Sequence, residues 1–526
     1  MQPNPPYQTR LVPLPLLCAF LFVLLHALAG PARSAADAPA IAAAAPQPAP
    51  LPWLAGDGAQ ARLALRLLDA AGAHGLDPAH YGAGALAARL PALRGPDAAA
   101  AFERDLDAAM LRYLGDLHGG RTASVYRAPG GASARFDPAA RLAAALRAGR
   151  LEQAVEDAAP ALPLYRRVQA SLARHRELAR RHPEWPPLPA IEGAALAAGE
   201  RYAGAALLAE RLRLLGDLDA AAAVDAGDGL LTPALAAALG RFQARHGLAE
   251  DRKLGPRTLA ALAVSPGRRA DQLALTLERL RWLPPLAPGP VVAVNLPAYR
   301  LWAFDSREGA SAQPLEMRII VGTAARTPTP LFIGEMRYLE LNPYWNVPRS
   351  IVVGEIIPKL ARNPSYLREN DMELVPASGQ ALPEAGAGAA LAALRAGSAR
   401  LRQRPGPRNV LGALKFAMPN PMNIYLHSTS AKELFARARR DLSHGCIRVE
   451  RPVELAEFVL ADPARWNAAA LEAAIGSGRT RTLALAAPVP VVLFYATAVA
   501  DRDGRALFAD DIYGQDPPLL RALRAP

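Results

Sequence analysis

A short segment that holds two histidines and a cysteine could carry nucleophilic chemistry. It runs from His427, at the end of an apolar stretch, to the string Ser443-His444-Gly445-Cys446. A thiol attacks a carbonyl carbon only as the thiolate, and a neighbouring imidazole can take the thiol proton. The segment therefore predicts acyl transfer by a cysteine, with a histidine as the general base.

The two histidines differ in how freely they can reach the sulfur. His444 is so near to Cys446 along the chain that its side chain has restricted geometry for this contact. His427 would lie on a separate strand and could approach freely, so we expect His427 to be the base and His444 to support it. Gly445 lets the loop expose consecutive N–H groups, and those of Gly445 and Cys446 are candidates for an oxyanion hole.

Arg448 follows the cysteine and has two possible roles. It could orient a substrate carboxylate, or it could brace the loop through a structural ion pair. Zinc binding by His427, His444 and Cys446 is a further alternative, and one of the two histidines could be purely structural. No fourth ligand occurs at customary zinc spacing, so we expect neither a metal nor another cofactor.

The cysteine content and the N-terminus indicate an exported protein. The chain has two cysteines, and Cys18 lies within an apolar run from Leu11 to Ala29 that follows Arg10. This pattern indicates a secretory signal peptide and a periplasmic location, with an uncleaved inner-membrane anchor as the alternative. Export would leave Cys446 as the single thiol of the mature protein, and a single thiol can form no internal disulfide.

The formal net charge is +12 and the pI is about 10.0. The basic residues are arginines scattered through Ala- and Leu-rich helices, and no nucleic-acid motif accompanies them. We therefore expect no nucleic-acid partner, and a polyanionic cell wall would suit the same charge.

The elements that must position this chemistry indicate an α+β multidomain protein. The 526 residues divide as follows: 1–36 signal peptide, 37–50 Ala/Pro linker, 51–205 helical scaffold domain, 206–266 small helical unit, 267–289 connecting helix, 290–480 catalytic domain and 481–526 C-terminal strands and tail. Short β-branched runs such as Val291–Val294 and Arg318–Val321 make the catalytic domain mainly β. Residues about 360–408 interrupt it as an insertion with several glycines, and we expect this insertion to act as a mobile lid.

The small helical unit at 206–266 has clear helix signals. Thr232 is placed to cap a helix that begins at Pro233, and Leu235, Leu239 and Phe242 follow at helical spacing. The whole string resembles the three-helix peptidoglycan-binding domain. A generic helical hairpin is the alternative, and such units can also be purely structural.

The segment from Ser443 to Arg448, preceded by His427, resembles the signature of the L,D-transpeptidase (YkuD-type) catalytic domain. Further strings, among them Asn342–Pro348 and Gln403–Asn409, resemble the large YcbB-like branch of that family. The likeness runs from about residue 51 to the C-terminus and is densest in the catalytic half. Many members end the motif with Asn where this chain has Arg448, whereas Arg is usual in the YcbB-like branch.

The resemblance implies roles for individual residues. Cys446 would be the nucleophile and His427 the base, with the imidazole oriented by the carbonyl of Ser428. Ser443 and Arg448 would orient the loop or the substrate. The side chains of the string Tyr344-Trp345-Asn346 would line the cleft, although Trp and Tyr in a strand are more often core residues.

The resemblance also implies a fold and a reaction. The fold is a β-sandwich-like catalytic domain with an inserted lid. The reaction forms 3→3 cross-links between peptidoglycan stem peptides through a cysteine thioester, and carbapenem-type inhibitors acylate the same sulfur; no partner wall synthase is named. Two alternatives stay open: an L,D-carboxypeptidase or hydrolase that uses the same cysteine, and a non-catalytic peptidoglycan-binding scaffold with a decayed site.

Overall fold

The computed structural model describes residues 52–125, 136–221, 228–309, 313–380 and 386–525. The expected signal peptide and linker fall outside these ranges. No helix within the described ranges is long and apolar enough to cross a membrane. Contacts group Pro50–Pro526 into one unit, and the regions below belong to it.

The first region is helical, as expected. Its helices are α1 (Ala59–Asp69), α2 (Ala83–Arg89), α3 (Pro96–Gly119), α4 (Pro138–Ala148), α5 (Leu151–Ala158) and α6 (Pro163–Arg181), with the short 3-10 turns η1 (Ala70–His74), η2 (Pro78–Tyr81) and η3 (Leu90–Ala92). Several helices begin with a proline, whose fixed φ and missing N–H suit the first helical position. Leu106, Met110 and Tyr113 of α3 are at most 1% exposed and form the centre of this helical core.

Three helices build the small unit that follows. They are α7 (Ala205–Leu214), α8 (Pro233–Arg245) and α9 (Pro256–Ala263). Thr232 caps α8, because its Oγ1 accepts the N–H of Leu235 at 3.3 Å. Phe242 is fully buried with leucines of α7 and α9, so the predicted apolar face of α8 is the core of this unit. The connecting helix α10 (Pro266–Arg281) then begins at a Ser265 cap.

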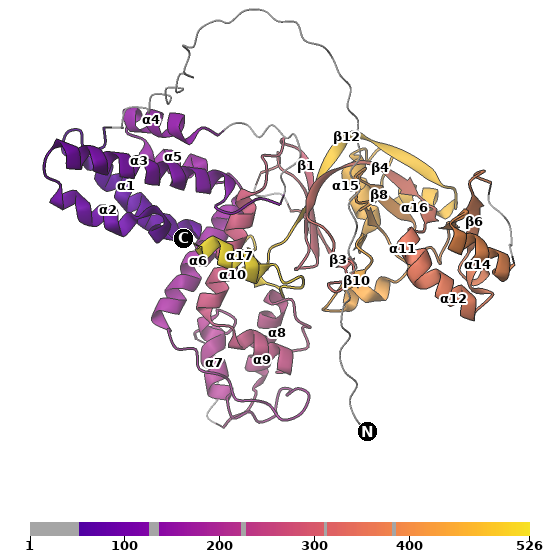
Figure 1. The fold of residues 1–526 in the computed structure, drawn as a ribbon. Coiled ribbons are helices and arrows are strands. Elements are labelled where there is room, and N and C mark those ends of the chain that lie inside the picture. The colour runs from indigo at the N-terminus through magenta and orange to yellow at the C-terminus, as the bar shows by residue number, and fades with distance from the viewer. Residues whose placement is uncertain (1–51, 126–135, 222–227, 310–312, 381–385, 526) are drawn as a thin grey trace, which may run out of the picture. The chain divides into compact units, whose positions relative to one another are not determined.

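The last region is mainly β, as expected (Figure 1). One nine-stranded sheet has the order β10-β3-β11-β9-β8-β4-β12-β1-β2, and an additional pairing of β2 with β3 closes it. Its strands are β1 (Pro290–Asn295), β2 (Arg300–Asp305), β3 (Leu315–Gly322), β4 (Phe332–Leu341), β8 (Leu414–Ala417), β9 (Leu426–His427), β10 (Asp441–Ser443), β11 (Ile447–Val449) and β12 (Arg481–Phe494). The C-terminal strand β12 lies between β1 and β4, so the segment after residue 480 supplies a central strand of this sheet.

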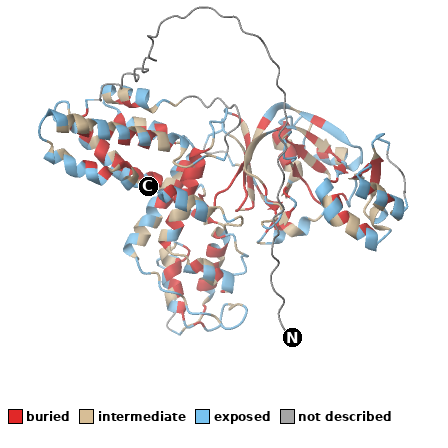
Figure 2. Ribbon diagram, in the orientation of Figure 1, coloured by how far each residue is buried: buried red, intermediate tan, exposed pale blue. Residues whose placement is uncertain are grey.

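The closed sheet and two helices share one apolar core. Inward-facing strand residues such as Val292, Phe416 and Leu426 are unexposed, and α15 (Pro452–Leu460) and α16 (Ala468–Gly476) add leucines to them. Figure 2 shows these buried positions, in red, along the strands. A β-hairpin of β13 (Ala498–Ala500) and β14 (Ala506–Phe508) follows, so residues 481–508 contain strands as expected. The helix α17 (Asp516–Arg524) lies where only a tail was expected.

The insertion has its own elements and its own apolar core. These elements are β5 (Trp345–Asn346), α11 (Arg349–Ile351), the π-helical turn η4 (Val352–Ile356), α12 (Ile357–Arg362), α13 (Tyr366–Glu369), β6 (Met372–Pro376), α14 (Ala387–Ala396) and β7 (Ala399–Gln403). The three strands pair in the order β5-β7-β6. Trp345 belongs to the apolar core of the insertion, so its folded elements start before the expected residue 360.

Candidate active site

The register of β9 against β11 sorts side chains onto two faces of the sheet. The two strands run parallel, with Leu426 opposite Ile447 and His427 opposite Arg448. Successive strand residues point to opposite faces. Leu426 and Ile447 are 0% exposed in the core, so His427 and Arg448 lie on the other face, and Cys446 directly precedes this pair of positions.

Ser443 holds the loop that carries the cysteine. Its buried Oγ donates to the carbonyl of Cys446 at 2.6 Å and accepts the N–H of Gly445 at 3.1 Å. Thr329 donates to the Gly445 carbonyl at 2.8 Å, and Thr327 donates to the Ser443 carbonyl at 3.1 Å. Gly445 has a φ of 114°, which favours glycine. Ser443 is therefore buried beneath the loop and braces the backbone around Cys446.

Of the two N–H groups expected to form the oxyanion hole, one already has a hydrogen-bond acceptor. Because the Gly445 N–H is bonded to the Ser443 hydroxyl, it does not point to an empty site in this structure. Within the described ranges, the N–H of Cys446 has no backbone acceptor. This correction arises because the serine hydroxyl folds back under its own loop, a contact that the sequence motif does not reveal.

His427 is 4% exposed and oriented by its neighbour in the chain. Its Nδ1 lies 2.6 Å from the carbonyl oxygen of Ser428, so Nδ1 carries the hydrogen and Nε2 is the basic nitrogen. Burial, followed by the charge of Arg448, lowers the pKa of His427 to about 3. The imidazole is therefore neutral at neutral pH and can accept a proton.

Tyr425 lies beside the ring of His427. Its ring and that of His427 have centroids 5.7 Å apart in an edge-on arrangement. Burial, followed by the nearby charge of Cys446, raises the pKa of the phenol. The ring also packs against the apolar core of the insertion, which includes Trp345. Sequence reasoning missed this residue, although its place two positions before His427 on one strand puts both side chains on the same face.

Cys446 is half-buried and contacts several polar groups. Its Sγ lies 3.7 Å from the carbonyl oxygen of Asn423. Burial raises the pKa of the thiol, while Tyr425 and the charges of Lys415 and Arg448 act in the opposite direction. No hydrogen bond joins Sγ to the His427 ring in this structure, where the two residues are diagonal neighbours on paired strands. The resting cysteine is therefore a neutral thiol next to a neutral imidazole.

Arg448 shows no structural ion pair. Within the described parts of the chain, its guanidinium makes no ion pair, and its buried Nε has no hydrogen-bond partner. Burial lowers the pKa of this side chain. A cation left unpaired beside Cys446 can receive a carboxylate, which favours the substrate-orienting role over the bracing role.

His444 points away from the cysteine and toward the insertion. Its Nε2 lies 2.5 Å from Oε1 of Glu355 in η4, and both side chains are partly exposed. Burial acts to raise the pKa of Glu355, but the hydrogen bonds and charges of His444 and Lys359 lower it on balance. His444 thus links the catalytic loop to the expected lid.

The string Tyr344-Trp345-Asn346 divides between two environments. Trp345 is 9% exposed and contacts Tyr425, so it touches the site from within the core of the insertion. Tyr344 is exposed, with the guanidinium of Arg402 4.2 Å from its ring centroid, and Asn346 is also exposed.

No group of metal-ligating side chains occurs among the residues that the structure describes.

Three families match successive parts of the chain. Residues 47–172 match the "Scaffold domain", residues 203–262 the "Putative peptidoglycan binding domain" and residues 289–491 the "L,D-transpeptidase catalytic domain". Each match covers the region in which the structure places the corresponding helices or strands.

A curated relative and two solved structures are also similar. A "Putative L,D-transpeptidase" of Haemophilus influenzae is 33% identical over 246 residues, which is 47% of this chain and 48% of the relative, so the match spans about half the length of that protein. An L,D-transpeptidase structure from Stackebrandtia nassauensis is 12% identical, covering 59% of this chain and 97% of its own, with a TM-score of 0.23. One from Xylanimonas cellulosilytica is 16% identical, covering 58% and 99%, with a TM-score of 0.18. TM-scores of this size do not establish a shared overall fold.

Proposed function

We propose, from the premise that residues 289–491 carry a YkuD-type L,D-transpeptidase catalytic domain, that this protein cross-links peptidoglycan stem peptides through a thioester on Cys446. The observation that carries the proposal is that the partly exposed Cys446 precedes the paired positions of His427 and Arg448, with Tyr425 beside the His427 ring. The domains that act on peptidoglycan imply an extracytoplasmic location, and the apolar N-terminal run supports export to the periplasm.

The first step is formation of the acyl-enzyme. The thiol proton passes to Nε2 of His427, and Sγ attacks the carbonyl that links the penultimate residue of a tetrapeptide stem to its terminal D-Ala. The Tyr425 hydroxyl and the charges of Lys415 and Arg448 stabilise the thiolate. The N–H of Cys446 is available to the oxyanion. The C–N bond then breaks, D-Ala leaves with the proton from His427, and a thioester remains.

The second step transfers the acyl group to an amine. A side-chain amine of a second stem attacks the thioester carbon, His427 takes its proton, and the C–S bond breaks to return the thiol. The product is a 3→3 cross-link. Trp345 and the His444–Glu355 contact tie the insertion to the site, so closure of the insertion would exclude water and favour the amine as acceptor.

Acylation by a carbapenem tests the role of the cysteine directly. Intact mass spectrometry of the purified full chain should show one covalent adduct, and the Cys446→Ala variant should show none. A Ser477→Ala variant serves as the matched control, since this exposed serine lies far from the site in the chain. Adduct formation on Cys446→Ala, or no adduct on the wild type, would sink the proposal.

Muropeptide analysis separates transfer from hydrolysis. Tetrapeptide muropeptides incubated with the enzyme should give new dimers with 3→3 links. Tripeptides without dimers would instead support an L,D-carboxypeptidase with the same nucleophile. Retained wall binding with unchanged muropeptides would support a non-catalytic scaffold.

A further inference from the structure

A cavity of about 460 Å³ lies between the C-terminal end of α8 and the turn that joins β1 to β2. This volume is within the range of small-molecule sites, roughly 300–1,000 Å³. Its walls also include residues after η5 (Lys432–Ala436), residues of the strands β13 and β14 and the residues that follow β14, and none of the catalytic candidates lines it. The cavity is therefore a site apart from the cysteine.

Positive charge dominates the lining of this cavity. Seven arginines and three acidic residues line it. Some of these arginines are neutralised by carboxylates, as when Arg439 forms two hydrogen bonds to Asp441 at 2.7 and 2.9 Å. Arg437 and Arg440 differ, because neither forms an ion pair with any described carboxylate. These two neighbouring cations are therefore left without an anion.

Arg440 is the buried member of this pair. It is 8% exposed, and its guanidinium donates to the carbonyls of Ile319 at 3.1 Å, Tyr299 at 3.3 Å and Arg437 at 2.5 Å. It also lies 5.1 Å from the centroid of the Tyr299 ring. Burial, followed by the charges of Arg300 and Arg318, lowers the pKa of Arg440 to about 10. A fixed, poorly solvated cation of this kind is stabilised by a bound anion.

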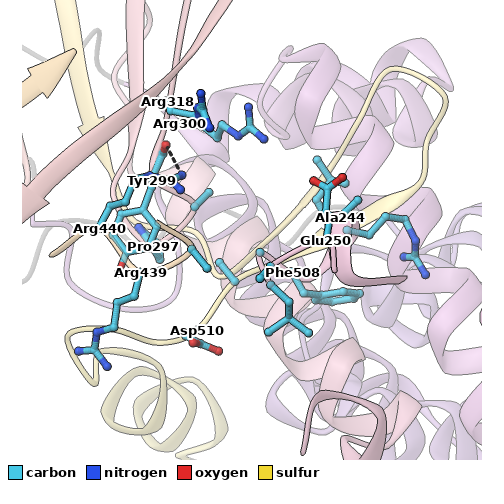
Figure 3. A pocket seen from close by; sticks show the side chains of 18 of the residues that line it. Ala244, Glu250, Pro297, Tyr299, Arg300, Arg318, Arg439, Arg440, Phe508 and Asp510 are labelled. Atoms are coloured by element: carbon cyan, nitrogen blue, oxygen red, sulfur yellow. Dashed lines mark hydrogen bonds between the residues drawn. The ribbon is translucent and has the colours of Figure 1, made fainter. Parts of the chain in front are cut away.

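The opposite wall supplies an acidic group. Figure 3 shows Glu250 across the cavity from Arg439 and Arg440, with Arg300 and Arg318 extending from the strands. Glu250 is exposed and pairs with no cation in the described parts of the chain. The cavity thus offers unpaired cations on one side and an unpaired carboxylate on the other, which is complementary to a ligand with both a carboxylate and an ammonium group.

We propose that this cavity binds a second cell-wall peptide through its free carboxylate and ammonium groups, with Arg437 and Arg440 on the carboxylate and Glu250 on the amine. The proposal rests on the proposed function, which it deepens by adding a non-catalytic peptide site. Simple phosphate would leave the carboxylate of Glu250 unpaired, and a bare glycan chain would leave both charged walls unpaired.

Calorimetric titration of the full-length Cys446→Ala protein tests the site without turnover. The probe is a soluble disaccharide-tetrapeptide with a free side-chain amine. Arg437→Glu should weaken binding by at least about tenfold, since a charge-assisted contact is lost and a repulsive one is gained. The matched control is Arg66→Glu on the exposed face of α1, which makes the same charge change and should leave the affinity unaltered.

A second variant probes the acidic wall. Glu250→Gln should weaken binding of the free-amine probe but not of a probe with an acetylated amine. Equal affinities for Arg437→Glu and Arg66→Glu, equal binding of a peptide-free glycan, or full competition by inorganic phosphate would each overturn the proposal. Carbapenem acylation of Cys446 is measured separately on proteins that keep the thiol. Failure of acylation with intact Arg437-dependent binding would refute the proposed function alone.

Discussion

Two buried histidines in different domains have similarly lowered pKa values but different neighbours. His74 lies in the helical scaffold and His427 in the catalytic domain, at 5% and 4% exposure. Burial, followed by the charge of Arg281 for the first and of Arg448 for the second, lowers the pKa of each to about 3. Both imidazoles are therefore neutral at neutral pH.

The difference lies in whether the neighbouring polar groups are satisfied. Arg281 pairs with Glu278 at 2.8 Å, both side chains being 0% exposed, and donates to the Tyr165 hydroxyl, which in turn contacts His74 at 3.1 Å. Arg448, by contrast, has a buried Nε without a partner and lies beside a half-exposed thiol. A lowered pKa alone therefore does not distinguish the two histidines, whereas a buried donor without a partner beside a free thiol does.

Replacing the arginine beside each histidine should change the free energy of unfolding by very different amounts, and this is the largest difference expected between the two regions. Arg281→Met leaves Glu278 buried without its cation and should lower the free energy of unfolding by about 3–5 kcal/mol. Arg448→Met breaks no ion pair and should cost less than about 1 kcal/mol of stability. Urea unfolding followed by circular dichroism measures both changes. Similar losses for the two variants would mean that the two networks are equally structural.

Replacing each histidine with glutamine should affect the rate of carbapenem acylation in the catalytic domain only. His427→Gln removes the proposed base and should slow carbapenem acylation of Cys446 by roughly 10²–10⁴-fold. His74→Gln should leave the acylation rate unchanged, because that histidine belongs to the scaffold network. The time course of adduct mass measures the rate. Full-speed acylation by His427→Gln would remove this histidine from the mechanism.

The common state of the two histidines predicts how stability depends on pH. Each pKa is about 3 in the folded protein and near 6.5 in the unfolded chain, so only the unfolded state binds these protons between those values. Stability is therefore full above about pH 6.5 and falls as the pH drops toward 3, by up to about 1.4 kcal/mol per pH unit for each histidine. Unfolding midpoints of wild type and His74→Gln from pH 4.5 to 7.5 measure this slope. An equally steep slope in the variant would contradict the assignment.

The parts of the fold that depend on residues close together in the sequence could be predicted. The string from Ser443 to Arg448 lies within the residues that match the L,D-transpeptidase catalytic domain. The Thr232-Pro233 start identifies α8 because a cap and its helix are neighbours in sequence. The helical first half and mainly β last region follow in the same way from local periodicity.

Features that depend on register or on distant contacts were not predictable. The place of Tyr425 near Cys446 depends on the parallel pairing of β9 with β11, which sets the residues before the two strands side by side. The contact between His444 and Glu355 joins positions 89 residues apart. The Gly445 N–H was expected to be open because the motif does not show the Ser443 hydroxyl turning back to it.

Replacing one tyrosine beside each histidine should give the smallest difference between the two regions. Tyr425→Phe removes the hydroxyl that lowers the pKa of the Cys446 thiol, so acylation at pH 7 should slow by roughly tenfold, the value of one charge-assisted hydrogen bond. The deficit should shrink as the pH rises, because hydroxide then produces the thiolate without help from the phenol.

Tyr165→Phe instead removes a partner of His74 and Arg281, and it should cost about 1–3 kcal/mol of stability with no change in the acylation rate. Acylation rates across pH 6–10 and urea unfolding measure both variants. A deficit in Tyr425→Phe that is equal at every pH would show that the phenol positions the substrate and does not stabilise the thiolate.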